Sequence, residues 1–128
     1  MKILVAEDDL VLRRILQLTL SRWGWEVVTA CHGQESLDIL SQPDAPPVAL
    51  LDWSMPQLDG IQLCRALRAG GAVHLPYIIM LTGRGGDDSL KEALEAGAND
   101  FILKPFENKN LRSCLEHAQE HVRRHAPH

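Results

Sequence analysis

Five polar side chains stand directly after short apolar runs of the chain: Glu7, Asp8, Asp52, Thr82 and Lys104. Among them, Asp52 is the candidate for a reacting group. It ends the apolar run 48–51 and is followed at once by a turn that contains Pro56. A carboxylate in that position lies at the rim of a sheet, where open α/β sheets bind their ligands.

These residue types favour phosphoryl chemistry around a divalent cation. Carboxylates packed together repel one another unless a positive charge lies between them. Mg²⁺, or Mn²⁺, fits such oxygen ligands, and the absence of His and Cys from this set argues against zinc. A carboxylate beside a metal ion, a lysine and a hydroxyl group can attack phosphorus and become an aspartyl phosphate.

Each of these residues also has an ordinary structural interpretation. A single Asp at a strand end is usually a cap or a turn residue, and a Lys before Pro is usually solvated. Asp8 and Asp9 could simply cap the first helix. The placement of chemistry-bearing side chains at four strand ends favours a common site over four unrelated coincidences.

The elements that must position these residues alternate between strand and helix five times. Strands are expected at 2–6, 25–30, 48–52, 77–81 and 101–103, and a helical pattern follows each. Alternation of this kind predicts an α/β fold with a parallel sheet covered by helices on both faces.

The order of the strands follows from where the polar residues fall. The second strand ends on Ala30 and Cys31, which carry no evident chemistry, so we place it at an edge. The order 2-1-3-4-5 then brings the other four strand ends together, in a doubly wound, flavodoxin-like sheet. Inward-facing apolar positions are expected to include Ile15 in the first helix, and Leu90 and Leu94 in the fourth.

Composition fits one ordinary globular domain. The chain has 128 residues, 45% of them hydrophobic and 23% charged, with a formal net charge of −4. A net negative charge does not indicate nucleic-acid binding, and no apolar run is long enough to span a membrane. The start of the chain turns acidic too soon for a signal peptide. Cys31, Cys64 and Cys114 form no CxxC pair, and we interpret them as buried thiols in a cytoplasmic protein.

Histidines recur every four residues near the C-terminus, at His117, His121 and His125. This spacing stacks them on one helix face, which could bind a transition metal. The zincin pattern needs Glu directly after the first His, and here that residue is Ala118. A solvated helix face is the favoured interpretation.

The sequence resembles the receiver domains of two-component response regulators. The segments that carry the resemblance are 3–9, 52–60, Thr82, 96–101 and 104–106. It spans residues 1–122 and leaves 123–128 as a frayed tail. Any one of these motifs is weak, whereas together they are highly specific.

The resemblance implies that Asp52 accepts phosphate from a histidine kinase or a histidine phosphotransfer protein. Mg²⁺ would be bound by Asp8, Asp52 and the backbone carbonyl of Ser54, with Glu7 acting through water. Thr82 and Lys104 would contact the phosphoryl group. Such a domain is not an enzyme in the usual sense, since it catalyses only its own phosphorylation and dephosphorylation.

A switch is also implied. Phe101 matches the aromatic residue that moves inward after Thr82 moves, and the Lys104–Pro105 bond would be cis. The readout surface would be the fourth helix, fifth strand and fifth helix, which would bind an output domain, a target protein or a second copy. Gly83 and Arg84 border the site, and we expect Arg84 to alter the lifetime of the phosphoryl group.

Two other functions remain as alternatives. A hydrolase of the haloacid dehalogenase type also uses an Asp nucleophile, but it places a second Asp two residues later, where this chain has Ser54. A pseudo-receiver would bind partners without phosphate, and the intact set of polar residues argues against it. Whether the domain stands alone or belongs to a longer regulator or hybrid kinase is left open.

Overall fold

Strands and helices alternate without interruption in the computed structural model, which describes residues 1–70, 75–83 and 87–125. The strands are β1 (Lys2–Ala6), β2 (Glu26–Ala30), β3 (Val48–Asp52), β4 (Tyr77–Thr82) and β5 (Asp100–Leu103). The helices are α1 (Leu10–Arg22), α2 (Gly33–Leu40), α3 (Gly60–Ala69), α4 (Asp87–Ala96) and α5 (Asn108–Arg124).

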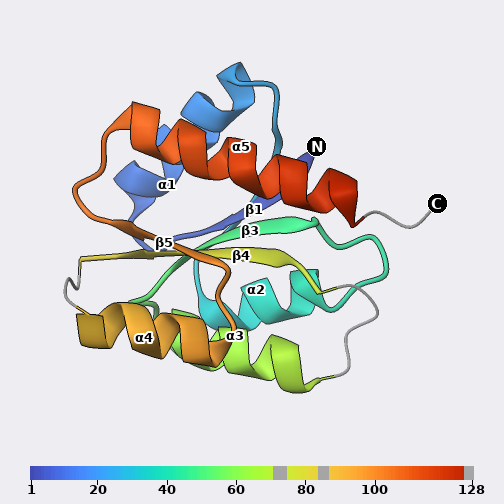
Figure 1. Cartoon of the computed structure of the whole chain (residues 1–128), viewed down its shortest axis with the longest axis vertical. Coiled ribbons are helices and arrows are strands. Elements are labelled where there is room, and N and C mark those ends of the chain that lie inside the picture. The colour runs from blue at the N-terminus through green and yellow to red at the C-terminus, as the bar shows by residue number, and fades with distance from the viewer. Residues whose placement is uncertain (71–74, 84–86, 126–128) are drawn as a thin grey trace.

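The strands form one parallel sheet in the order β2-β1-β3-β4-β5, which confirms the predicted order. Figure 1 shows α1 and α5 on one face of this sheet and α2, α3 and α4 on the other. Because helices cover both faces, the central strands can be apolar along their whole length. β3 illustrates this, since every one of its residues is buried.

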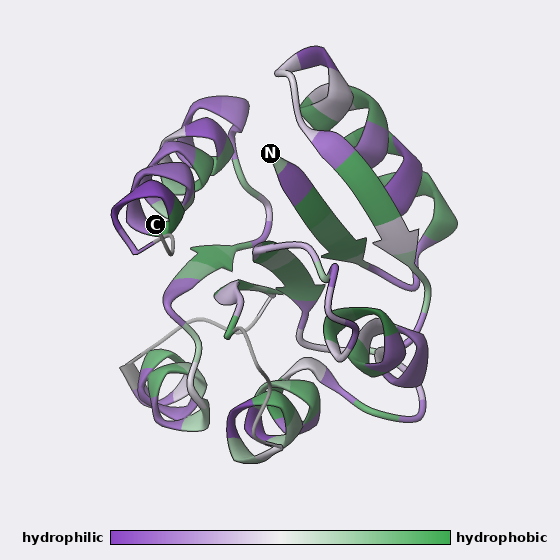
Figure 2. Ribbon diagram, turned by 90° about the vertical axis from the view of Figure 1, so that its right-hand side faces the viewer, coloured by the Kyte–Doolittle hydropathy of each residue, from purple (hydrophilic) through white to green (hydrophobic). Residues whose placement is uncertain are grey.

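Two hydrophobic cores result, one on each face of the sheet. Side chains of a strand alternate between the faces, so Ile3 and Val5 enter the core beneath α1 and α5. Leu4 and Ala6 enter the core beneath α2, α3 and α4. The hydropathy colouring of Figure 2 shows the strands as the most apolar part of the chain, while the helices carry both apolar and polar stripes.

Three apolar side chains that the helical spacing places in the core are instead exposed. Ile15 is 54% exposed, and Leu90 and Leu94 are 40% and 50% exposed. In α4 the fully buried contact is made by a small residue, Ala93, which brings the helix close and leaves the longer side chains outside. The apolar stripe of each helix is therefore wider than the face that the sheet can cover.

Local boundary signals agree with the helix starts. Asp9 caps α1 by accepting hydrogen bonds from the backbone amides of Val11 and Leu12, at 2.9 and 3.1 Å. Asp59 and Gln62 form a reciprocal capping box at the start of α3. At the other end of the chain, α5 continues to Arg124, two residues beyond the expected boundary at 122, and residues 126–128 lie outside the described part.

The three cysteines differ in exposure, so the expectation of three buried thiols is wrong. Cys31 is exposed, Cys64 is buried and Cys114 is partly buried, and all three are free thiols. Burial raises the pKa of Cys114 to about 12, and its hydrogen bond to the Asp100 carboxylate, at 3.0 Å, adds to the rise. Burial also raises the pKa of the Cys64 thiol.

This difference predicts the order in which the thiols react. In native protein near pH 8, a maleimide or iodoacetamide is expected to modify Cys31 first. The rise in the pKa of Cys114, from 9.0 to about 12, lowers its thiolate population about a thousandfold. Peptide mapping after partial labelling measures the order, and faster labelling of Cys114 than of Cys31 would contradict it.

Among the described residues, no helix combines the length and the apolar character that crossing a bilayer requires.

Candidate functional site

The C-terminal ends of four strands line up at one edge of the sheet. The strand register pairs Ala6 with Leu51 between β1 and β3, and Asp52 with Leu81 between β3 and β4. Backbone bonds extend the alignment past the strands, since the amide of Trp53 donates to Leu81 at 2.8 Å. Residues that are far apart in sequence thus arrive at one rim.

The structure brings Glu7, Asp8, Asp52 and Lys104 together at this rim. One carboxylate oxygen of each acid lies within 4.8 Å of those of the other two. The Lys104 ammonium lies 3.0 Å from Glu7 Oε1 and 3.2 Å from Asp52 Oδ1. Lys104 therefore bridges two acids that come from different strands.

Burial decides the electrostatics of this group. Glu7 is 1% exposed and Asp52 is 5% exposed, whereas Asp8 is open to solvent. Burial raises the pKa of Glu7 to about 8, and Asp52 adds to the rise while Lys104 opposes it. Burial by itself would lower the pKa of the Lys104 ammonium, but Glu7 and Asp52 together hold it above its ordinary value.

The donor set fits a hard divalent cation. Lys104 contacts Glu7 at Oε1, whereas Glu7 Oε2 is a buried oxygen with no hydrogen-bond partner among the described residues. A buried acceptor of this kind is satisfied by a proton, or by a water held on a cation. Mg²⁺ keeps several of its water ligands in proteins, and the exposed position of Asp8 leaves room for them.

The other predicted site residues occupy neighbouring positions. Thr82 ends β4 and is 1% exposed, and its carbonyl accepts from the Lys104 amide at 2.7 Å. Phe101 is half-buried and packs against the core beneath α2, α3 and α4. Ser54 and Gly83 are exposed in the turns after β3 and β4, and Arg84 lies outside the described residues.

The turn between β3 and α3 approaches Asp52 closely at a glycine. A Cβ on Gly60 would lie 2.7 Å from the Asp52 carbonyl oxygen and 2.7 Å from the sulfur of Met80. The Gly60 amide donates to the Trp53 carbonyl at 2.9 Å, which closes the turn. A side chain at 60 would push α3 away from Asp52, so this glycine fixes the wall of the site. The Lys104–Pro105 bond is cis, as expected.

The segment 96–101, which carried part of the resemblance, has a structural role that sequence reasoning did not assign. The Asn99 side chain accepts from the Ile78 amide at 2.8 Å and from Arg68 at 2.9 Å. Arg68 also donates twice to the Gly97 carbonyl, at 2.7 and 3.0 Å. These bonds tie the end of α3 to the start of β4, and their partners are too far apart in sequence to be read from spacing.

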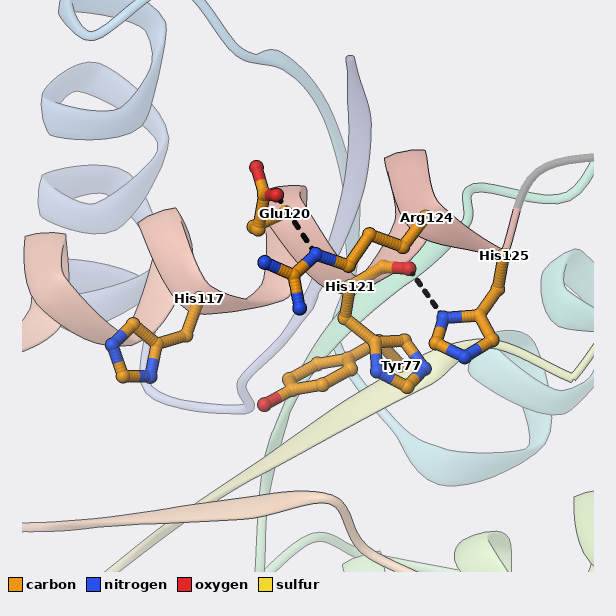
Figure 3. Close-up of a pocket in the computed structure, with 6 residues that line it drawn as sticks. All are labelled: Tyr77, His117, Glu120, His121, Arg124 and His125. Carbon is orange, nitrogen blue, oxygen red and sulfur yellow. Dashed lines mark hydrogen bonds and ion pairs between the residues drawn. The ribbon is translucent and has the colours of Figure 1, made fainter.

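The three histidines line a shallow pocket of about 350 Å³ on α5 (Figure 3). His121 packs against Tyr77 of β4, with ring centroids 5.0 Å apart, and against His125, at 4.2 Å. His125 Nδ1 lies 2.8 Å from the His121 carbonyl. Among the described residues, these histidines do not belong to any group of three or more side chains that could hold a metal ion. All three histidines are exposed, in agreement with a solvated face, although the His121 ring also contacts its neighbours.

Comparison with known proteins agrees with this geometry. A sequence model described as the response regulator receiver domain matches residues 3–116. A chemotaxis protein CheY homolog of Campylobacter jejuni is 39% identical over 117 residues, which cover 91% of this chain and 90% of that protein. A probable transcriptional regulator, ycf27 of Cyanophora paradoxa, is 44% identical over 114 residues, covering 89% of this chain but only 46% of that protein.

Solved structures give the same result. The receiver domain of a sensor histidine kinase from Pseudomonas aeruginosa superposes with a TM-score of 0.82 at 27% identity, covering 91% of this chain and 95% of that one. That structure has a magnesium ion coordinated in its active-site cleft. These relatives are signalling proteins, which sets aside the hydrolase alternative. The chain belongs to the receiver domain family of two-component response regulators.

Proposed function

We propose that Asp52 is the phosphoacceptor of this receiver domain and takes its phosphoryl group from a phosphohistidine on a kinase or a phosphotransfer protein. The observation that carries the proposal is the bridge from Lys104 to both Asp52 and Glu7, at 3.2 and 3.0 Å, with Asp8 beside them. A lysine paired with two buried acids fixes the reacting carboxylate at the rim.

Each residue of the site has a separate part in the transfer. A carboxylate oxygen of Asp52 attacks phosphorus as the bond between phosphorus and the donor imidazole nitrogen breaks, and the imidazole leaves with its electron pair. Lys104 offsets the charge that gathers on the phosphoryl oxygens. Mg²⁺ held by Asp8, Asp52 and the Ser54 carbonyl, with Glu7 acting through water, would neutralise the same oxygens.

The test of this function is phosphorylation by a small donor that needs no partner protein. Incubation with phosphoramidate and Mg²⁺, followed by intact mass measurement, is expected to show a gain of one phosphoryl group that a chelator of divalent cations prevents. A pseudo-receiver would stay unmodified under these conditions. Absence of any gain in mass from folded protein would contradict the proposal.

Phosphorylation would switch the domain through Thr82 and Phe101. The phosphoryl group on Asp52 carries nearly two negative charges in place of the single charge of the carboxylate, and the Thr82 hydroxyl, on the adjacent strand, can donate to the new oxygens. A state in which Thr82 moves toward them opens space for Phe101, which is half-buried on β5. The phosphoryl group shifts the balance between the two conformations only because its contacts differ between them.

The surface of α4 and β5 is suited to transmit that switch. Leu90 and Leu94 of α4 and Leu103 of β5 are all at least 40% exposed. Apolar side chains that gather on a surface mark protein interaction sites. We assign this surface, with α5, to the output partner, which is a target protein, a tethered output domain or a second copy of the chain.

A second apolar surface borders the site itself and is suited to the phosphodonor. Leu10, Val11, Ile15 and Leu18 of α1 are 48–68% exposed. Because α1 begins directly after Asp8 and Asp9, a protein that docks there can present a phosphohistidine to Asp52. The free thiols favour a cytoplasmic location for this exchange.

Replacing Ile15 with Glu tests the docking surface. The variant is expected to lose about tenfold or more in the rate of transfer from its phosphohistidine donor, because burying an unpaired charge opposes docking. Phosphorylation by phosphoramidate should be unchanged, since that donor needs no docking surface. Leu94→Glu is the matched control on the opposite face. Equal loss with both donors would place the effect in the site and contradict the assignment.

A further inference from the structure

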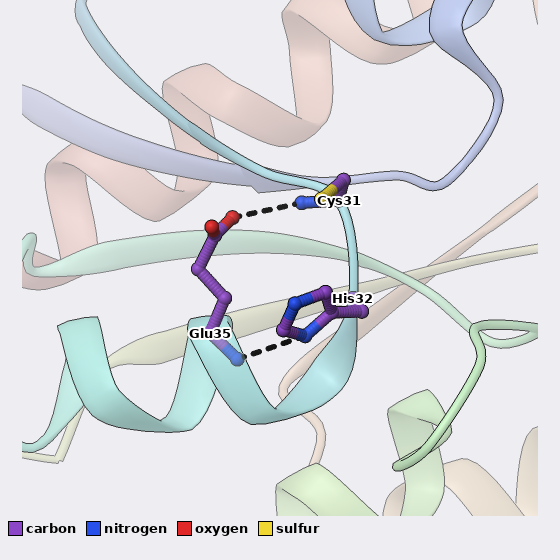
Figure 4. A group of neighbouring side chains, drawn as sticks. All are labelled: Cys31, His32 and Glu35. Carbon is purple, nitrogen blue, oxygen red and sulfur yellow. Dashed lines mark hydrogen bonds between the residues drawn. The ribbon is translucent and has the colours of Figure 1, made fainter.

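A second group of metal-type ligands lies where β2 ends and α2 begins. Figure 4 shows Cys31, His32 and Glu35 gathered at this turn. A ring nitrogen of His32, the sulfur of Cys31 and a carboxylate oxygen of Glu35 all lie within 4.8 Å of one another. This group contains sulfur and nitrogen, unlike the all-oxygen group of Glu7, Asp8 and Asp52, so it has a different metal preference.

Hydrogen bonds to the backbone orient two of these side chains, those of His32 and Glu35. His32 is the N-cap of α2, and its Nδ1 accepts from the Glu35 amide at 3.1 Å. Glu35 Oε1 accepts in turn from the Cys31 amide at 3.0 Å. Gly33 packs so tightly that a Cβ there would overlap the Leu58 carbonyl oxygen. The backbone of the turn that carries the three ligands is thus fixed against the loop that follows β3.

We propose that Cys31, His32 and Glu35 form a site for a borderline-soft divalent ion, namely Zn²⁺. Thiolate, imidazole and carboxylate are the ligands that Zn²⁺ takes in proteins, whereas Mg²⁺ takes oxygen alone. In a tetrahedral site the donor atoms are ~3.5 Å apart, so atoms that already lie within 4.8 Å of one another need only a small closure. Cys31 is exposed, which gives the ion a path of entry and leaves the fourth position to water.

Binding at this site is coupled to the start of α2. Because Nδ1 of His32 accepts the Glu35 amide, a neutral ring carries its proton on Nε2. An ion on Nδ1 displaces the Glu35 amide from that nitrogen, and an ion on Nε2 drives the ring proton to Nδ1. Either way the cap hydrogen bond is given up, and the Cys31 thiol releases its proton to solvent. The bonds from the ion to its ligands therefore replace the cap hydrogen bond between His32 and Glu35 as the contact that fixes the turn.

The test uses Co²⁺ as a spectroscopic substitute for Zn²⁺, on the full chain and with excess Mg²⁺ to occupy the oxygen site. One equivalent of Co²⁺ is expected to produce a near-ultraviolet sulfur-to-cobalt charge-transfer band, which added Zn²⁺ then removes. Oxygen ligands cannot produce this band, so it reports on Cys31 and not on the phosphoacceptor site.

Three variants assign the ligands, with fold checked by the urea midpoint. Cys31→Ser should abolish the band. His32→Asn keeps a good N-cap residue and Glu35→Gln keeps an acceptor for the Cys31 amide, and each should weaken Co²⁺ binding by about tenfold or more. Cys114→Ser and His121→Gln are controls that should leave the band unchanged.

Two results would overturn the proposal. Wild-type protein that shows no charge-transfer band at stoichiometric Co²⁺ has no thiolate site, and the turn then serves only to cap α2. A band that survives in Cys31→Ser, or one that disappears in Cys114→Ser, places the ion on a different thiol. Neither result affects the phosphoacceptor proposal, which uses none of these side chains.

Discussion

Replacing Asp52 with Asn is expected to abolish phosphorylation. The amide has nearly the same size and its oxygen still accepts from Lys104, so the rim keeps its packing. It carries no charge and is not a nucleophile toward phosphorus, so the reacting atom is lost while its surroundings stay. After incubation with phosphoramidate and Mg²⁺, the intact mass of the variant should be unchanged.

Asp9→Asn is the matched control for this result. Asp9 lies next to Asp8 but serves as the N-cap of α1, a role that Asn fills equally well. The control should therefore gain one phosphoryl group like the unmodified chain. Uptake by the Asp52→Asn variant would show that a different acid is the acceptor, and loss of uptake in Asp9→Asn would show that the effect is not specific to Asp52.

Replacing Lys104 with Met is expected to separate metal binding from phosphoryl transfer. Loss of the ammonium removes a positive charge 3.0–3.2 Å from two acids, so the Kd for Mg²⁺ should fall by about tenfold. Phosphorylation should nevertheless slow by about a hundredfold, because the charge that stabilises the transferring group is gone. Titration with Mg²⁺ and the time course of mass gain measure the two effects on one sample.

Lys109→Met controls for loss of a lysine elsewhere. Its side chain is 80% exposed and lies 3.7 Å from Glu107, so both measurements should be unaffected. Lys104→Arg keeps the charge and should leave the Kd for Mg²⁺ near its original value, which separates a charge effect from damage to the fold. Weaker Mg²⁺ binding by Lys104→Met would contradict the electrostatic role given to this residue.

Much of this architecture is encoded in local sequence. The alternation of strand and helix patterns predicts the layers, and the polar residues at strand ends predict that β2 lies at an edge. Both predictions are confirmed by the sheet order. The contact of Glu7 and Asp52 with Lys104 follows from the same reasoning, because parallel strands deliver their carboxyl ends to one rim.

Other features depend on packing that spacing does not encode. Ile15 and Leu94 fit a helical apolar stripe, yet both are exposed because the sheet covers a narrower face than the stripe. The group of Cys31, His32 and Glu35 is local in sequence, but it contains no familiar ligand spacing, and only the cap geometry of α2 shows that the side chains converge. The bonds of Arg68 to the segment 97–99 join distant residues and have no signal in spacing.

Chemical mapping of the phosphoryl group tests whether Asp52 is the residue that carries it. Phosphorylated protein is reduced with borohydride, which converts an aspartyl phosphate to homoserine, and its peptides are then sequenced by tandem mass spectrometry. We expect homoserine at position 52 and aspartate at positions 8 and 9. Homoserine at another position, or an unreduced Asp52 in protein that carries phosphate, would contradict it.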